Sequence, residues 1–352
     1  MFTKNSSEII VNARFLTQPI TGVQRFAVEL CRRLPKKIGN TSIIFVAPKN
    51  VILNNTDDFP EITTFGTFKG QLWEQIDLPL FLKNKGNPLL VNLVGIGPIL
   101  YRNKIMALYD LAFKHFPEWF SYSFQKVYNT FIPISLKNSR IIITDSNYVK
   151  KDICSTYKTE KEKVEVIYAA PSQIFTFDNL EREKFILTVS SIDPRKNLVR
   201  IIKAFNLLKT NHKLIIVGSK NKTFKGLKLD ENLLSDKIIF TGYLDDNELI
   251  SLYNRAAIFI YASLFEGFGI PPLEAQACGC PCIVSRSTAL PEIYSNSVEY
   301  CDPYSIEDIS ERLHNVLNCD TLKSDLQTKG LVNVKRYDWD KSAKQLLKLL
   351  EI

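Results

Sequence analysis

The chain has no long hydrophobic run. Its longest apolar stretch, 88–101, is interrupted by Asn92, Gly95 and Gly97 and is shorter than the roughly 20 residues that a transmembrane helix needs. The first eight residues, MFTKNSSE, have no apolar core of the kind found in secretory signals. These absences predict a cytoplasmic protein, whose one membrane contact would be peripheral, on the inner face of the cytoplasmic membrane.

Cysteine is too scarce for a disulfide scaffold. The chain has 7 cysteines in 352 residues, and an odd number leaves at least one thiol unpaired, which favours a reducing compartment. Cys278, Cys280 and Cys282 alternate along one segment, but no second pair of ligands completes a tetrahedral metal site. We therefore expect no metal.

The glycine fingerprint of nicotinamide-dependent dehydrogenases is incomplete. That fingerprint requires Gly-x-Gly-x-x-Gly after a strand, whereas Gly95-Ile96-Gly97 is followed by Pro98-Ile99-Leu100. A dehydrogenase would share the doubly wound sheets predicted below, but the missing third glycine argues against it.

The net positive charge of the chain lies in its first half. Residues 1–170 hold 22 Lys and Arg against 14 Asp and Glu, and residues 171–352 hold 23 against 23, so the first half carries the whole net charge of +8. This asymmetry predicts an anionic partner for the first half, either a membrane surface or an acidic polymer, and no nucleic acid is expected. A merely soluble basic surface is the alternative.

Short apolar runs alternate with helical patterns along the whole chain. This alternation predicts parallel sheets with crossover helices, hence an α/β fold. The predicted strands are 9–12, 42–47, 89–93, 104–108 and 140–144 in the first half, and 185–190, 213–217, 238–241, 258–261 and 281–284 in the second.

Two domains and a closing helix follow from this pattern. The stretch 168–179 contains Pro and polar residues without periodicity and is the best linker candidate. We expect one α/β domain at 1–170 and a second at 171–336. In the remaining 337–352, the apolar spacing of 339–350 predicts a helix.

Two glutamates bracket a glycine turn that opens a helix. Glu266 precedes the turn, Gly267 and Gly269 allow close approach of a ligand to the backbone, and Glu274 lies in the first turns of the helix. The helix start attracts an anion such as a diphosphate, and a carboxylate can accept hydrogen bonds from sugar hydroxyls. Together these features suit a nucleotide sugar.

With its neighbouring motifs, this segment resembles the retaining glycosyltransferases of family 4, also called group 1. The resemblance rests on the Glu-x7-Glu spacing and on an ordered set of segments: Thr21-Gly-Val-Gln-Arg-Phe, Tyr109-Asp-Leu, Asp145-Ser-Asn-Tyr, Val189-Ser-Ser-Ile-Asp-Pro-Arg-Lys-Asn and Phe240-Thr-Gly-Tyr-Leu. It implies the GT-B fold, with two Rossmann-like doubly wound domains facing across a cleft: an acceptor-binding domain at 1–170 and a nucleotide-sugar-binding domain at 171–336. The same resemblance implies that the closing helix, 337–352, crosses back to the first domain. It also implies that Cys280 and Cys282 are small buried residues without chemistry.

The resemblance assigns most donor contacts to the second half. Arg195 and Lys196 would face the donor diphosphate, beside Asn197 as the cap of a following helix; Glu266 would contact the donor sugar and Glu274 the ribose. The implied donor-binding residues are Gly22, Arg195, Lys196, Gly242, Tyr243, Leu244, Gly267, Phe268, Gly269, Ile270 and Glu274. Each motif alone is also typical of a surface pair or a helix cap.

The first half departs from the family at one position. Many relatives have His-Asp where this chain has Tyr109-Asp110, and a tyrosine cannot act as an imidazole does near neutral pH. The catalytic candidates are Glu266, Asp110 and Tyr109, and the acceptor-side candidates are Arg25, Ser146 and Asn147. Ser146 and Asn147 have a helix cap as their alternative role.

The sequence thus predicts a retaining, metal-independent hexosyltransferase of surface-polysaccharide assembly, in O-antigen or capsule. The donor would be a nucleotide sugar, with GDP-mannose favoured, and the acceptor a glycan or lipid-linked glycan. No cofactor is expected. The alternatives are a transferase that acts on a soluble sugar and a catalytically silent subunit that binds nucleotide sugars.

Overall fold

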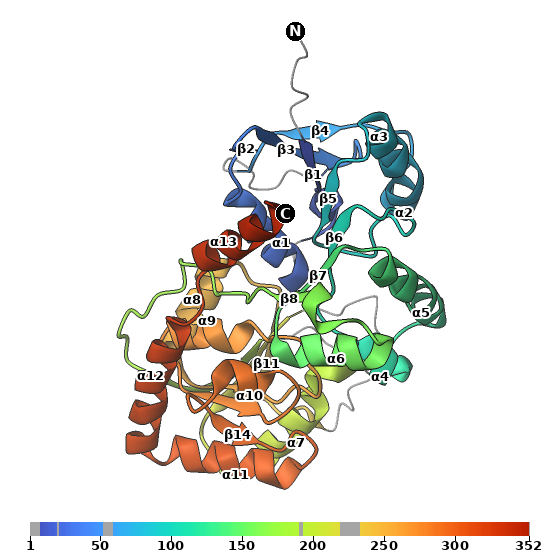
Figure 1. The fold of residues 1–352 in the computed structure, drawn as a ribbon. Coiled ribbons are helices and arrows are strands. Elements are labelled where there is room, and N and C mark those ends of the chain that lie inside the picture. The colour runs from blue at the N-terminus through green and yellow to red at the C-terminus, as the bar shows by residue number, and fades with distance from the viewer. Residues whose placement is uncertain (1–7, 20, 52–58, 190–192, 219–232, 352) are drawn as a thin grey trace. The chain divides into compact units, whose positions relative to one another are not determined.

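The computed structural model describes residues 8–19, 21–51, 59–189, 193–218 and 233–351 (Figure 1). The chain forms two compact units: the first holds Met1–Leu111, Lys126–Ala169 and Trp339–Ile352, and the second holds Ala112–Gln125 and Ala170–Asp338. The predicted first domain, 1–170, was continuous, whereas the structure gives Ala112–Gln125 to the second unit. Within the part of the chain described, no helix is long and apolar enough to cross a bilayer.

The first unit is built on one largely parallel sheet. Its order is β2-β3-β1-β5-β6-β7-β8, with β4 paired to β3 and β2 antiparallel to β3. The strands are β1 (Glu8–Asn12), β2 (Lys37–Ile38), β3 (Thr41–Ala47), β4 (Ile62–Thr64), β5 (Leu89–Asn92), β6 (Lys104–Ala107), β7 (Ile141–Thr144) and β8 (Val164–Val166). The helices are α1 (Gly22–Arg32), α2 (Gly70–Leu72), α3 (Leu78–Asn84), α5 (Tyr122–Lys137), α6 (Asn147–Tyr157) and α13 (Trp339–Leu350). The first residues of α5, up to Gln125, belong to the second unit. Trp339 of α13 packs edge-on against Phe26 of α1, at 5.5 Å between ring centroids.

The second unit has a fully parallel sheet of order β11-β10-β9-β12-β13-β14. Its strands are β9 (Glu183–Val189), β10 (Lys213–Val217), β11 (Ile238–Gly242), β12 (Ala256–Tyr261), β13 (Cys282–Ser285) and β14 (Glu299–Cys301). Its helices are α4 (Ala112–His115), α7 (Leu198–Leu207), α8 (Asp246–Arg255), α9 (Pro271–Ala277), α10 (Leu290–Tyr294), α11 (Ile306–Leu317) and α12 (Asp320–Val334).

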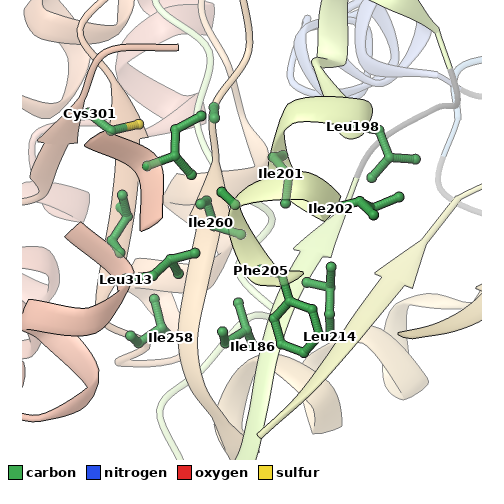
Figure 2. Packing of buried hydrophobic residues seen from close by; sticks show 14 of the residues in the cluster. Ile186, Leu198, Ile201, Ile202, Phe205, Leu214, Ile258, Ile260, Cys301 and Leu313 are labelled. Atoms are coloured by element: carbon green, nitrogen blue, oxygen red, sulfur yellow. The ribbon is translucent and has the colours of Figure 1, made fainter. Parts of the chain in front are cut away.

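The core of the second unit explains why its central strands are apolar throughout. All residues of β12 are buried, as expected for a parallel strand that is covered on both faces. On one face, Ile258 and Ile260 of β12 pack with Ile201 of α7 and Leu313 of α11 in a single buried cluster (Figure 2). This packing fixes the strand ends from which the functional loops emerge.

In each sheet the chain order reverses at one pair of neighbouring strands. From β9 the chain moves outward to β10 and β11, then returns to β12 on the other side; from β1 it moves to β3 and returns to β5 in the same way. Doubly wound sheets bind ligands outside the carboxyl ends of the strands at such a reversal. A ligand is therefore expected at the carboxyl ends of β9 and β12.

Candidate active site

The carboxyl ends of β9 and β12 bring a cation, a carboxylate and a phenol together. Lys196 ends a short 3-10 turn after β9, Tyr261 is the last residue of β12, and Glu266 lies in the loop that follows. Lys196 Nζ donates to Glu266 Oε1 at 2.7 Å and to the Tyr261 hydroxyl at 2.6 Å. The Tyr261 hydroxyl donates to Glu266 Oε1 at 2.8 Å. We call these three residues the donor cluster.

The charge states of the donor cluster follow from burial and from mutual attraction. Burial acts to raise the pKa of Glu266, but Lys196 and Arg195 outweigh it, and the pKa is lowered overall. Burial lowers the pKa of Lys196 against the opposing pull of Glu266, and burial raises the pKa of Tyr261 well above its ordinary value. Glu266 is therefore an ionised acceptor at neutral pH, and Tyr261 a neutral donor.

Hydrogen bonds from neighbouring residues hold the turn that carries Lys196. The Leu264 N–H donates to the Arg195 carbonyl at 2.8 Å, and Asn197 Nδ2 donates to the carbonyls of Ala262 at 2.9 Å and Pro303 at 2.6 Å. The sequence predicted Asn197 as the cap of the helix that begins near Leu198. Asn197 does occupy the N-cap position of α7, but its side chain makes no capping hydrogen bond, because its amide donates to these carbonyls.

Arg195 lies on the same turn with a different partner. Its Nε is 3.9 Å from Asp193 Oδ1, and Asp193 is fully buried. The two predicted phosphate-binding cations thus stand side by side in sequence, with Lys196 bonded to Glu266 and Arg195 near Asp193. Their combined charge is concentrated at the carboxyl end of β9.

The glycine segment before α9 is held by close packing. Gly269 has φ +86°, and a Cβ there would lie 2.7 Å from Leu290 Cδ2. Its carbonyl accepts from the Tyr294 hydroxyl, and the ring of Phe268 meets that of Tyr337 edge-on at 5.6 Å between centroids. Gly267 is buried and Ile270 immediately precedes α9, so a helix begins where the sequence predicted one.

The two glutamates of the spacing motif have separate partners. Glu274, in α9, accepts a hydrogen bond from the Tyr253 hydroxyl of α8 at 3.3 Å, whereas Glu266 belongs to the donor cluster. Both are buried. The motif therefore sets two carboxylates in two different polar environments.

The remaining predicted donor residues of the second unit follow β11. Gly242 ends this strand with φ +78°, and its carbonyl accepts from the Gly218 N–H at 2.8 Å. The side chain of Tyr243 is 78% exposed and Leu244 is half-buried. These residues lie at the carboxyl edge of the same sheet as the donor cluster, with β10 between their strand and β9.

The catalytic candidates of the first unit sit in the loop after β6. The Tyr109 hydroxyl donates to the Leu93 carbonyl at 2.6 Å, and its ring meets that of Phe26 at 5.0 Å. Burial raises the pKa of Tyr109 well above its ordinary value. Tyr109 is thus a neutral, internally bonded phenol, and Asp110 is the half-buried carboxylate that follows it.

The acceptor-side candidates lie at two helix starts of the first unit. Ser146 Oγ accepts from the Val149 N–H at 3.2 Å and caps α6, and Asn147 Nδ2 donates to the Tyr168 hydroxyl at 2.7 Å. Arg25 lies in the first turn of α1, as does Gly22, which was predicted to bind the donor.

The start of α1 carries a capping box. The Thr21 N–H donates to Gln24 Oε1 at 3.2 Å, and the Thr21 hydroxyl bonds the same oxygen. A Cβ at Gly22 would meet no atom within 4 Å, so packing does not require glycine there.

A buried polar network in the first unit was not predicted. Glu74 lies in a π-helical turn and accepts from Arg14 Nε at 3.1 Å, Arg14 Nη2 at 3.3 Å and Asn12 Nδ2 at 2.7 Å. Asn12 also donates to Asn92 Oδ1 at 2.6 Å. Asn12 and Asn92 end β1 and β5, where the strand order reverses. Polar residues at the ends of two predicted strands were the signal available in the sequence.

Two further residues of the second unit were missed. Tyr261 ends a predicted strand and completes the donor cluster, and Thr288, after β13, accepts the Glu266 N–H on its hydroxyl at 3.0 Å. Position at a strand end could have indicated Tyr261. Thr288 is 22 residues from Glu266 and has no comparable signal.

The cysteines after α9 are core residues of the second unit. Cys280 and Cys282 are buried, and burial raises the pKa of Cys280 to about 12. Across the described ranges, no group of three or more His, Cys, Asp and Glu side chains is arranged to hold a metal ion.

Comparison with known proteins gives the class. The sequence profile of glycosyl transferases group 1 matches residues 171–331. O-antigen chain mannosyltransferase RfbU of Salmonella typhimurium is 31% identical over 258 residues, which cover 72% of this chain and 71% of that one. O-antigen chain mannosyltransferase B of Escherichia coli is 22% identical over 384 residues, covering 97% and 98%. The chain belongs to glycosyl transferases group 1.

Solved structures give the fold. HepE of Anabaena, in complex with UDP and glucose, matches with a TM-score of 0.75 at 14% identity, covering 98% of this chain and 99% of that one. The two parallel sheets are those of a GT-B glycosyltransferase, which confirms the predicted fold class.

Proposed function

We propose that the protein transfers a hexose or deoxyhexose from a nucleotide sugar to a glycan or lipid-linked glycan, with retention of configuration, during O-antigen synthesis. The observation that carries the proposal is the donor cluster of Lys196, Tyr261 and Glu266 at the strand reversal. The names of the two O-antigen mannosyltransferases support mannose as the sugar, and GDP-mannose is the donor we favour.

Such an enzyme must stabilise the negative charge that develops on the leaving diphosphate. An ammonium group has three N–H donors, and among the described residues Lys196 spends two, on Glu266 and Tyr261. The third can meet a phosphate oxygen, and Arg195 adds a second cation on the same turn. Two fixed cations stabilise the negative charge that develops as the glycosidic bond breaks. This arrangement is the basis for proposing metal-independent transfer.

The carboxylates would hold the sugar and the ribose. Glu266 is ionised, and its second oxygen, Oε2, can accept a donor-sugar hydroxyl while Oε1 serves Lys196 and Tyr261. Glu274 would accept the ribose hydroxyls, and Gly242, Tyr243 and Leu244 would lie beside the base. No nucleophile is assigned to the opposite face of the sugar, so the leaving diphosphate would act as the base for the incoming hydroxyl.

Residues of the first unit would bind the acceptor. The Tyr109 hydroxyl already donates to the Leu93 carbonyl, so Tyr109 suits a positioning role better than proton transfer. Asp110 then remains the candidate that orients the acceptor hydroxyl, with Arg25, Ser146 and Asn147 at two helix starts of this unit as further acceptor-side candidates.

A nucleotide screen followed by product analysis tests this function. GDP should raise the melting temperature more than UDP, ADP and dTDP, because a ligand that binds only the folded state stabilises it. GDP-mannose with a lipid-linked acceptor should then give an α-linked product, identified by NMR, in the presence of a chelator. Nucleotide binding without turnover on any donor would instead support the silent subunit, and a β-linked product would contradict retention.

A further inference from the structure

The second unit contains a cavity that the proposed donor chemistry does not use. Its volume is about 360 Å³, which falls within the range of roughly 300–1,000 Å³ typical of small-molecule sites. The segment 112–125 and the start of α7 form much of its wall. The side chains that matter here are Phe116, Glu118, Trp119, Asn197, Arg200 and Tyr304.

Aromatic rings form a stiff part of this wall. The rings of Phe116 and Trp119 stack in parallel with centroids 4.1 Å apart and an interplanar angle of 3°, and Phe116 meets Phe265 edge-on at 5.7 Å. Tyr304 adds an exposed ring. Such rings present flat apolar faces whose electron-rich surface attracts C–H groups.

The cavity is lined by charged groups of both signs. The Arg200 guanidinium lies over the Tyr304 ring at 5.7 Å and donates from Nη1 to Asn197 Oδ1 at 2.9 Å. A guanidinium has five N–H donors, and this bond uses one. The Glu118 side chain is exposed and has no hydrogen-bond or ion-pair partner within the described ranges.

The two charged groups and the aromatic wall together indicate which class of ligand the cavity can bind. An anion near Arg200 would be repelled by Glu118, and a cation near Glu118 would be repelled by Arg200. A neutral ring with several hydroxyls satisfies both, because each hydroxyl donates and accepts, while its C–H face packs on the aromatic wall. A sugar ring has this chemistry.

We propose that this cavity is a saccharide subsite that binds one sugar unit of the acceptor glycan. The inference rests on the proposed function in taking the acceptor to be a glycan. Asn197, which lines the cavity, directly follows Lys196 of the donor cluster in the chain, so the turn that carries Lys196 also borders the cavity. The subsite would hold a sugar unit remote from the reacting hydroxyl and would add affinity for longer acceptors.

The test uses the full chain without donor and measures saccharide binding by calorimetry. The probes are methyl α-mannoside, mannobiose, mannotriose and maltotriose, with inorganic phosphate as an anionic control. Tyr304→Ala should weaken binding of the best saccharide about tenfold, which corresponds to ~1.4 kcal/mol, and Glu118→Gln about threefold. Tyr122→Ala removes a tyrosine that is 78% exposed in the same unit but outside the cavity, and should leave binding unchanged.

Three outcomes would overturn the subsite. They are no binding of any of these saccharides at millimolar concentration, equal binding by Tyr304→Ala and the unchanged chain, and displacement of the saccharide by phosphate. Transfer assays separate this failure from that of the proposed function. If the enzyme transfers sugar but Tyr304→Ala has the same KM for short and long acceptors, the subsite is wrong and the function stands.

Discussion

The two units place a buried ion pair at the same point of their sheets and surround it differently. In the first unit, both oxygens of the fully buried Glu74 accept from Arg14, and Asn12 adds a third bond. In the second, Lys196 and Tyr261 both donate to Oε1 of Glu266, so Oε2 accepts from neither of them. Strand reversal gathers polar groups in both sheets, but the carboxylate oxygen that remains available decides whether a cluster only stabilises the fold or can also hold a ligand.

The largest expected effect is on stability in the first unit. Glu74→Gln leaves the Arg14 guanidinium buried without its counter-charge, which costs about 3–5 kcal/mol. Chemical denaturation should show this loss, and nucleotide binding should remain under native conditions. Glu183→Gln is the control, because its ion pair with Arg255 is exposed and should contribute less than about 1 kcal/mol. An equally small effect of Glu74→Gln would contradict a structural role for the network.

The second-largest expected effect is a loss of transferase activity. Lys196→Met removes a proposed phosphate contact and should lower kcat about 10²–10³-fold, or ~2.7–4 kcal/mol. It also leaves Glu266 buried and unpaired, so stability should fall. Adding Glu266→Gln should restore stability without restoring transfer, a split that distinguishes catalysis from folding. Lys329→Met breaks an exposed pair with Asp325 and should match the unchanged enzyme; full activity of Lys196→Met would refute the donor cluster.

A third effect concerns pH and a buried lysine of the first unit. Lys104 Nζ donates to the carbonyls of Pro98 and Tyr101 at 3.0 and 2.8 Å, and burial lowers its pKa to about 8. Between that value and the unfolded pKa of ~10.4, only the unfolded state keeps the proton, so stability rises with pH. The unfolding free energy should increase by about 2 kcal/mol from pH 8 to pH 10 relative to Lys104→Met. If the unfolding free energies of the two proteins changed equally with pH, the lowered pKa of Lys104 would be contradicted.

The smallest effects compare two glycines. Gly269→Ala places a Cβ against Leu290 at positive φ and should destabilise the second unit by about 1 kcal/mol or more and reduce transfer. Gly22→Ala meets no neighbouring atom and should stabilise α1 by up to ~1 kcal/mol. If Gly22→Ala also reduces transfer in kinetic assays, the approach of a ligand, and not packing, requires glycine there.

Much of the fold could be predicted because its central strands carry their own signal. The ten predicted strands coincide with β1, β3, β5, β6, β7 and β9 to β13, within two residues at each end; residue 190, the predicted end of the strand 185–190, lies outside the described residues. The missed strands β2, β4, β8 and β14 contain two or three residues each. Such short edge strands form through pairing with a neighbour and have too few apolar residues for a pattern.

The candidate site could be predicted where its residues lie in one motif. Arg195, Lys196 and the segment from Glu266 to Glu274 were named from local sequence, and the structure joins Lys196 to Glu266. The Arg14–Glu74 pair spans 60 residues, and no local pattern connects them. Asn197 was placed correctly at the start of α7, but the partners of its side chain could not be predicted, because Ala262 and Pro303 lie far away in the chain.

The buried thiols provide a separate way to measure the free energy of local unfolding of each unit. Cys31 lies in the first unit, and Cys278, Cys280, Cys282 and Cys301 lie in the second; all are buried and free. Only a thiolate reacts with alkylating reagents, and burial raises the pKa of every one of these groups. Their labelling must therefore await local unfolding. Mass spectrometry of labelled peptides would then give an opening free energy for each unit from a single sample.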